Sequence, residues 1–288
     1  MRNFEILFDH SEPPGAADLA HASYGRLGFP PPPDKRPWIY SNFVQSLDGI
    51  VSFKGLHPLG SDISQSPEDR WLMDLLRAHA DAILLGVNTL MEETRVSSSR
   101  GPVYRIEDPV LRDLRLRLGR RRETNIFVTA RRNFDPAAYR VFDGDLLHSL
   151  IVTTAEGSSR LLRKSPEFRD RVVVAGEGNQ VDLSMAVEIL RARFGIQYLL
   201  CEGGPTLYGY MSRAGLVDEK FVTVSPVEVG LFVPPEQEPP ASEKSNPLLV
   251  RPTTFTAPGF TKENAPWWQW LSCRRIGDHQ FSRYRRIR

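Results

Sequence analysis

Ile196-Gln-Tyr-Leu-Leu-Cys-Glu-Gly-Gly-Pro-Thr-Leu-Tyr-Gly-Tyr-Met211 is the stretch of this chain that decides the fold. Its β-favouring run at 198–201 is followed by Glu202, two glycines, Pro205 and a set of apolar residues at helical spacing. This pattern predicts a buried strand that ends at a turn of bare backbone and continues directly into a helix. The N–H groups of such a turn and the positive end of the helix dipole favour phosphate. For this stretch alone, an ordinary tight turn between strand and helix is the alternative.

A second segment, Ala82-Ile-Leu-Leu-Gly-Val-Asn-Thr89, has a similar design. Its apolar strand ends at Gly86, and the hydroxyl of Thr89 follows at the start of the next helical stretch. Two such strand ends predict a crevice at the carboxyl edge of a mostly parallel sheet, where open α/β proteins bind ligands. Neither turn contains G-x-G-x-x-G or G-x-x-x-x-G-K-[ST], which argues against a classical dinucleotide fold and a P-loop.

The composition is that of one sizeable enzyme domain. The chain has 288 residues, of which 41% are hydrophobic, and a formal net charge of +2, too small by itself to indicate a nucleic-acid surface. Cys201 lies in an apolar strand, far in sequence from Cys273, which indicates a reducing setting without disulfides. There is no apolar run near the roughly 20 residues of a membrane span, and the first ten residues lack the features of a signal peptide. We therefore expect a cytoplasmic protein that does not enter a membrane.

The order of the predicted elements indicates the fold class. We expect an extended N-terminal arm over residues 1–36 and one domain over 37–288. Predicted strands lie at 38–44, 82–85, 125–129, 150–154, 171–175, 198–201 and 221–224. Predicted helices begin after Ser66, at 89–93 and after Asp182, and a further one covers the arginine-rich stretch 112–122. After a Pro/Glu-rich loop at 233–247, strands at 268–275 and 279–284 form a hairpin. Alternating strands and helices closed by a hairpin predict an α/β fold with a largely parallel sheet and an antiparallel edge.

Several motifs carry a resemblance to a known family. They are Ser46-Leu-Asp-Gly49, the run from Leu76 to Thr89, Glu202-Gly-Gly-Pro205 with Gly215-Leu-Val-Asp-Glu219, and Phe281-Ser-Arg-Tyr-Arg285. In this order and spacing they resemble the reductase domain of riboflavin biosynthesis (RibD C-terminal type), a branch of the dihydrofolate-reductase-like superfamily. The resemblance covers the chain from about Arg36 to its end. It implies an NADPH-dependent reductase of a ribosylaminopyrimidine 5′-phosphate, such as 5-amino-6-ribosylaminouracil 5′-phosphate, with a ribityl product, and a homodimer.

The resemblance also implies site residues. The cofactor contacts of the family fall on Val44, Gly86, Thr89, Glu93, Gly203, Gly204, Pro205, Thr206, Leu207 and Tyr208. On the substrate side, Arg77 corresponds to a phosphate-binding arginine, and Arg100 matches a second one. Ser61 corresponds to a substrate-contacting serine, and Glu202 to a carboxylate that faces the substrate. Arginine offers a planar fork to phosphate oxygens, which suits the first two roles.

This chain also departs from the family pattern. Asn42 stands where the riboflavin enzymes often have lysine, and Asp62-Ile63 where a tryptophan is expected. Glu93 replaces the usual aspartate, and residues 93–100 lack an Asp-Asp-Pro pattern. Nothing matches the H-x-E and P-C-x-x-C pattern of the zinc deaminases, so we expect a stand-alone reductase. These changes leave the cofactor assignment firmer than the substrate assignment.

The sequence leaves several alternatives open. Asp48 and Glu202 are candidate proton donors beside water, although Asp48 can equally cap a turn. Arg131 and Arg132 follow a strand end. Two interpretations are open for them, a contact with the 2′-phosphate of the cofactor and an ordinary position on the surface. The six histidines show no metal-ligand spacing, so no metal is expected.

Three other functions compete with the pyrimidine reductase. They are a reductase of a pterin or dihydrofolate-like substrate, a non-catalytic nucleotide-binding homologue, and a nucleic-acid binder that uses the arginine-rich stretch 112–122. That stretch interleaves leucines with its arginines, which favours a solvated amphipathic helix instead. The aromatic C-terminal hairpin needs cover or pairing, which supports the homodimer.

Overall fold

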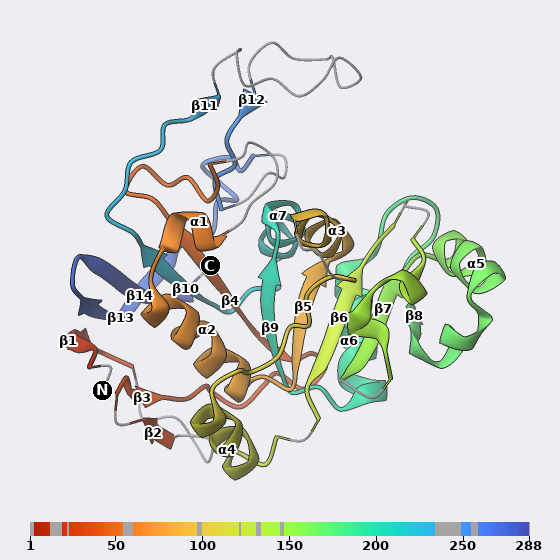
Figure 1. The fold of residues 1–288 in the computed structure, drawn as a ribbon, viewed down its shortest axis with the longest axis horizontal. Helices are drawn as coiled ribbons and strands as arrows, with labels where there is room; N and C mark the ends of the chain where they lie inside the picture. The colour runs from red at the N-terminus through yellow and green to blue at the C-terminus, as the bar shows by residue number, and fades with distance from the viewer. Residues whose placement is uncertain are drawn as a thin grey trace.

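The computed structural model describes residues 3–11, 19–21, 23–53, 60–96, 100–120, 122–130, 134–144, 147–233, 249–254 and 259–287. Residues 234–247 of the Pro/Glu-rich loop and the pair Arg131 and Arg132 lie outside these ranges. Within them, ten strands form one sheet in the order β1-β13-β14-β10-β4-β9-β5-β6-β7-β8 (Figure 1).

Seven of these strands are parallel and make up the larger part of the sheet. In sheet order they are β10 (Glu219–Val224), β4 (Trp38–Gln45), β9 (Tyr198–Gly203), β5 (Ala82–Gly86), β6 (Thr124–Val128), β7 (His148–Thr153) and β8 (Val172–Val174). The seven strands predicted from the sequence are thus confirmed, with ends shifted by a few residues. Because they are parallel, their carboxyl ends meet at one edge of the sheet.

The other end of the sheet is antiparallel, as expected. β14 (His279–Arg286) pairs with β10 and with β13 (Trp268–Ile276). Glu219 at the start of β10 is fully buried and lies 2.7 Å from Arg283 and 2.9 Å from Arg285 of β14. These ion pairs fix the register of the hairpin against the parallel part.

The N-terminal arm takes part in this end of the domain. Its strand β1 (Glu5–Asp9) pairs antiparallel with β13 and so covers the edge of the hairpin. Phe4, Tyr24, Leu27 and Phe29 are buried in the same core as α2. The arm therefore packs as part of the domain rather than only crossing its surface.

One face of the sheet is covered by α6 (Leu183–Phe194) and α7 (Pro205–Arg213). The predicted cap of α6 is present, since the Asp182 carboxylate accepts the N–H of Met185 at 2.9 Å. The helix ends at Gly195, which has a left-handed φ of 67°. Val187 and Leu190 of α6 pack with Met211 of α7 on the strands beneath.

The opposite face carries α2 (Pro67–His79), α3 (Val87–Val96), α4 (Pro109–Arg117) and α5 (Ala155–Lys164). The strands supply both cores by alternation: Leu199 faces α6, whereas Leu200 faces α2. The hydroxyl of Ser66 accepts the N–H of Asp69 at 3.2 Å and caps α2, as predicted. Helix α4 begins earlier than expected because Asp108 caps it by accepting the N–H of Val110 at 2.8 Å.

The arginine-rich helix α4 packs as an amphipathic helix. Leu111 and Leu114 are buried under it, and Arg115 is buried as well and donates to the carbonyl of Arg77 at 3.0 Å. Arg117 pairs with Asp113 one turn earlier. Of the three arginines of α4, Arg115 is thus engaged within the domain, whereas Arg112 and Arg117 are exposed.

Short elements complete the described structure. They are α1 (Gly60–Ser64), β2 (Leu19–His21), β3 (Gly25–Leu27), β11 (Phe232–Val233), β12 (Leu249–Val250) and 3-10 turns at Pro136–Ala138, Arg140–Phe142 and Pro166–Arg171. No helix in the described ranges is long and apolar enough to span a membrane.

Candidate active site

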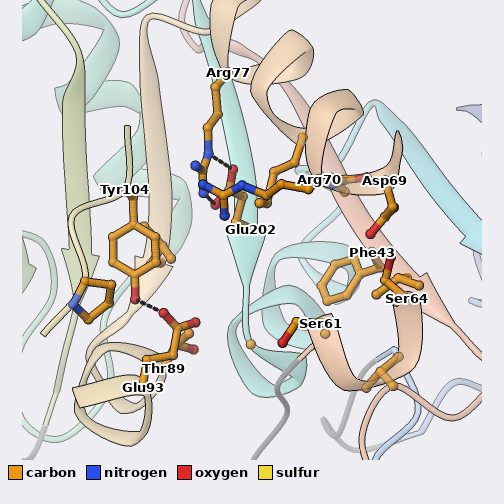
Figure 2. Close-up of a pocket in the computed structure, with 18 of the residues that line it drawn as sticks. Phe43, Ser61, Ser64, Asp69, Arg70, Arg77, Thr89, Glu93, Tyr104 and Glu202 are labelled. Atoms are coloured by element: carbon orange, nitrogen blue, oxygen red, sulfur yellow. Dashed lines mark hydrogen bonds and ion pairs between the residues drawn. The ribbon is translucent and has the colours of Figure 1, made fainter. Parts of the chain in front are cut away.

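A cavity of about 750 Å³ opens at the carboxyl edge of the parallel strands. It lies over the ends of β4, β5 and β9, and its walls come from α1, α2, α3, the segment 101–107 and the start of α7 (Figure 2). Residues from strands far apart in sequence meet here because those strands are neighbours in the sheet. This is the crevice that the two glycine-ended strands predicted.

The turn between β9 and α7 has the bare backbone that the sequence indicated. Gly203 and Gly204 have φ values of 36° and 73°, a region that disfavours residues with a Cβ. A Cβ on Gly204 would lie 2.7 Å from the hydroxyl of Thr89. No side chain caps the start of α7 at Gly204. The helix N-terminus therefore faces a space that a ligand phosphate fits and a Cβ would fill.

The other expected cofactor residues divide into two groups. Val44, Thr89, Glu93, Gly204 and Pro205 line the cavity. The remaining residues support that wall: Gly86 ends β5 beside Gly203, Thr206 is exposed, and Leu207 and Tyr208 are buried.

Tyr208 anchors this part of the site. Its ring packs edge-on against Phe43 of β4, with ring centroids 4.7 Å apart. This contact fixes α7 against the sheet and holds the Phe43 ring in the cavity wall.

Arg77 and Glu202 form a buried bidentate ion pair on the cavity wall (Figure 2). Arg77 Nε and Nη2 donate to the two oxygens of Glu202, each at 2.7 Å, and the side chains are only 3% and 8% exposed. Arg77 Nη1 lies 3.4 Å from Asp74 and donates to the carbonyl of Arg105 at 3.0 Å. Although burial acts to lower the pKa of Arg77, the Glu202 and Asp74 carboxylates hold it above its ordinary value. The charge of Arg77 is therefore already balanced within the protein.

The remaining predicted residues lie at different distances from the cavity. Ser61 of α1 lines it. Arg100 does not: its guanidinium pairs with Asp143 at 3.0 Å, and its side chain is 53% exposed. Asp48 is also outside the lining and exposed; its carboxylate accepts the N–H of Gly230 at 2.7 Å. A hydrogen bond from Ser46 lowers the pKa of Asp48, which fits the turn-capping alternative.

The segment 101–107 forms a cavity wall that the sequence did not indicate. The hydroxyl of Tyr104 donates to Glu93 at 3.0 Å. Burial raises the pKa of Glu93, the Tyr104 hydrogen bond opposes this rise, and the nearby Glu202 carboxylate adds to it. The sequence contained no signal for this pair, because Tyr104 lies in an irregular segment.

Helix α2 brings two further charged residues into the cavity, Asp69 and Arg70. Asp69 Oδ1 is buried and has no hydrogen-bond partner among the residues that the structure describes. Burial raises the pKa of Asp69, against the opposing effect of the Thr223 and Ser64 hydroxyls. Arg70 is 46% exposed and lies 3.3 Å from Glu107 and 3.9 Å from Asp74. Both residues lie in a motif that the sequence marks only as a helix start.

Other reactive groups of the domain do not add to this site. No cluster of three or more metal-ligating side chains occurs in the ranges that the structure describes. Cys201 is buried in β9, and burial raises the pKa of its thiol to about 12, so the thiol stays protonated. His79 is buried between the carbonyls of Leu75 and Leu27, and burial lowers its pKa to about 4.

The sheet and its cavity define an α/β protein with a cavity at the carboxyl edge of a mostly parallel sheet closed by an antiparallel hairpin. Within that class, the chain belongs to the RibD C-terminal domain family, which matches residues 37–250.

Individual relatives agree with this placement. A 2,5-diamino-6-ribosylamino-4(3H)-pyrimidinone 5′-phosphate reductase of Methanothermobacter thermautotrophicus is 31% identical over 205 residues, 68% of this chain and 80% of that protein. The protein of the same name from Archaeoglobus fulgidus is 28% identical over 195 residues, 68% of this chain and 83% of that protein.

A solved structure shares the fold. It is a pyrimidine reductase-like protein of Corynebacterium diphtheriae that is 22% identical, with a TM-score of 0.64 over 88% of this chain and 92% of the other. The likeness covers a larger share of the chain than the family match over residues 37–250. It therefore supports the mostly parallel sheet with its hairpin as one architecture.

Proposed function

We propose that the protein is an NADPH-dependent reductase of 2,5-diamino-6-ribosylamino-4(3H)-pyrimidinone 5′-phosphate in riboflavin biosynthesis. The family and the names of the two relatives support the reaction class and the substrate. The observation that carries the proposal for this chain is the cavity itself. It joins a glycine turn at a helix start, suited to a dinucleotide phosphate, to a polar wall suited to a ribosyl phosphate.

The residues at the β9–α7 turn fit the cofactor. Gly203 and Gly204 leave room for a phosphate beside the start of α7, and Thr89 lies across the turn with its hydroxyl 3.4 Å from the Gly203 carbonyl. Val44 offers an apolar surface at the end of β4. When bound, NADPH supplies a hydride to an electrophilic carbon of the substrate.

The polar wall has different tasks for its charged groups. Arg77 holds Glu202 in one orientation through two hydrogen bonds, and Glu202 retains lone pairs that accept from ribose hydroxyls. Arg70 lies on the same face of α2 as Arg77, two turns earlier, and is far less enclosed. We therefore assign the 5′-phosphate contact to Arg70 and a positioning role to Arg77.

The reaction needs one hydride and one proton. In the open-chain imine form of the ribosylamine, C1′ accepts the hydride and the imine nitrogen accepts the proton. The products are the ribitylamine and NADP⁺. Glu93, whose pKa is raised by burial, and water in the open cavity are the proton sources that this site offers. Asp48 lies outside the cavity lining, so we assign it to the turn.

Consumption of NADPH by the purified protein tests the proposal. The diaminopyrimidinone ribosyl phosphate should support oxidation of NADPH, and dihydrofolate should not. Oxidation with dihydrofolate alone would favour the pterin-type alternative. Tight NADPH binding without turnover of either compound would favour the non-catalytic homologue.

We also propose that the protein is a cytoplasmic homodimer. Both cysteines are buried and free of disulfides, which fits a reducing compartment. Exposed aromatic side chains on β13 and their neighbours on β1 and β14 support pairing of two copies through this end of the sheet.

A further inference from the structure

Asp69 is distinguished from the other cavity carboxylates by one oxygen, Oδ1, that lacks a hydrogen-bond partner among the described residues, although the Thr223 and Ser64 hydroxyls interact with its carboxyl group. Both oxygens of Glu202 bind Arg77, and Glu93 accepts from Tyr104. Asp69 Oδ1 is buried and has no partner in the part of the chain that the structure describes. A buried acceptor left unpaired loses its hydrogen bonds to water without replacement, which is unfavourable. A ligand that donates hydrogen bonds to Asp69 removes this penalty.

The surroundings of Asp69 indicate the shape of that ligand. The backbone N–H of Asp69 is taken by Ser66, while its side chain extends into the cavity toward Ser64 and Phe43 (Figure 2). Asn42 of the neighbouring strand β4 also lines the cavity. Its Oδ1 is a second buried acceptor that has no hydrogen-bond partner among the described residues. Unpaired acceptors beside an aromatic ring fit a flat heterocycle that carries N–H donors.

We propose that Asp69 binds the 2-amino group and the N3–H of the pyrimidinone ring and thereby selects the diaminopyrimidinone over the corresponding aminouracil. This inference rests on the proposed function and names the feature of the substrate that the same site reads.

The chemistry of the two rings explains the selection. The diaminopyrimidinone presents two donors side by side, and an ionised carboxylate accepts both in a bidentate pair. Such a partner also stabilises the charged form of a carboxyl whose pKa burial raises. In the aminouracil an oxygen replaces the 2-amino group, so a lone pair faces the carboxylate. Sites that form hydrogen bonds to a particular substrate group disfavour an analogue without that group by about a hundredfold or more in kcat/KM.

Substitution of Asp69 by asparagine changes the pattern that the site reads. The amide has one acceptor and one donor, which match the N3–H and the 2-oxo group of the aminouracil. We expect kcat/KM of the wild-type protein to favour the diaminopyrimidinone by about a hundredfold or more. In Asp69→Asn this preference should disappear or reverse, because the diaminopyrimidinone loses activity and the aminouracil gains it.

Glu68→Gln is the matched control. Glu68 lies in the same turn of α2 and carries the same charge, but its side chain bonds to Ser66 and is outside the cavity lining. This variant should keep the preference of the wild type. NADPH affinity, which reports an intact β9–α7 turn, should be unchanged in both variants.

The outcomes separate this inference from the proposed function. Equal turnover of both pyrimidines by the wild type would overturn the role of Asp69 and leave the reductase standing. An equal loss with both substrates in Asp69→Asn, at unchanged NADPH affinity, would also overturn it. Calorimetric titration of the wild type with each pyrimidine supplies a second measurement that needs no variant. Absence of both binding and turnover with either pyrimidine would overturn the two proposals together.

Discussion

At the scale of single residues, the buried pair of Arg77 and Glu202 is the reason why we propose a positioning role for this arginine in place of the phosphate contact that the resemblance implied. A phosphate anchor needs a charge that is available to the ligand, whereas Arg77 is buried with two carboxylates and a carbonyl around it. Removal of one partner from a buried pair leaves the other charge uncompensated in a medium that solvates it poorly.

We therefore expect Arg77→Ala to reduce stability as well as activity. The free energy of unfolding should fall by about 3–5 kcal/mol, measured by urea denaturation. Arg100→Ala is the control, because its ion pair with Asp143 is exposed and its loss should change stability by no more than about 1 kcal/mol. Equal, small losses in the two variants would show that the buried pair does not hold this wall of the cavity.

Much of the site was predictable residue by residue, and the exceptions have a physical reason. Thr89, Gly204 and Glu202 line the cavity because they lie at or just after the carboxyl ends of strands that meet there, which the sequence pattern indicates. Asp69 was overlooked because an aspartate in the first turn of a helix is expected for local reasons. Its unpaired oxygen becomes visible only once β4 and β10 pack against α2.

At the scale of elements, the β9–α7 turn joins the fold to the proposed cofactor site. Both of its glycines have positive φ, and a Cβ on Gly204 would meet Thr89 of α3. One short segment thus sets the exit of the strand, the start of the helix and the room left for a ligand.

Gly204→Ala should damage stability and cofactor binding together. The new Cβ would meet the Thr89 hydroxyl and strain the backbone, which should reduce stability by about 1–3 kcal/mol and NADPH affinity by about tenfold or more. Gly277→Ala is the control, since Gly277 has a φ of 53° in the β13–β14 turn, is outside the cavity lining and has nothing within 4 Å of a Cβ. It should cost about 1–2 kcal/mol of stability and leave NADPH binding intact. Thermal unfolding with and without NADPH measures both effects. Unchanged NADPH binding in Gly204→Ala would refute the proposal that the β9–α7 turn binds a phosphate of the cofactor.

The elements themselves were largely predictable because each carries a local signal. Asp182 and Gly195 bound α6, and Gly277 marks the hairpin. Strand β1 and helix α5 were not predicted from the sequence. The apolar residues of β1 are half-exposed, so their alternation is weak, and only the pairing with β13 shows the strand.

At the scale of the whole molecule, the antiparallel end of the sheet is the surface that we propose for assembly. The edge of β13 is covered by β1 of the same chain, so its face rather than its edge remains open. Trp270 lies on that face and is 43% exposed. Its ring centroid is 4.8 Å from that of Phe8 and 6.0 Å from that of Tyr284. Large exposed aromatic groups of this kind are typical of interfaces.

Trp270→Glu should therefore convert a dimer into a monomer. A charge in the centre of an apolar interface is desolvated without a partner, which is strongly unfavourable. Light scattering during size-exclusion chromatography measures the mass, with Val110→Glu on exposed α4 as the control that should remain dimeric. A wild-type protein that elutes as a monomer near 32.6 kDa would contradict this proposal.

The central claim is hydride transfer from NADPH to the ribose carbon of the diaminopyrimidinone substrate. Mass spectrometry of the product, formed with NADPH deuterated at the transferred position of C4, tests it most directly. We predict a ribitylamino product that carries one deuterium at C1′, formed in step with NADP⁺. A substrate recovered without deuterium, while the protein binds NADPH, would contradict the account.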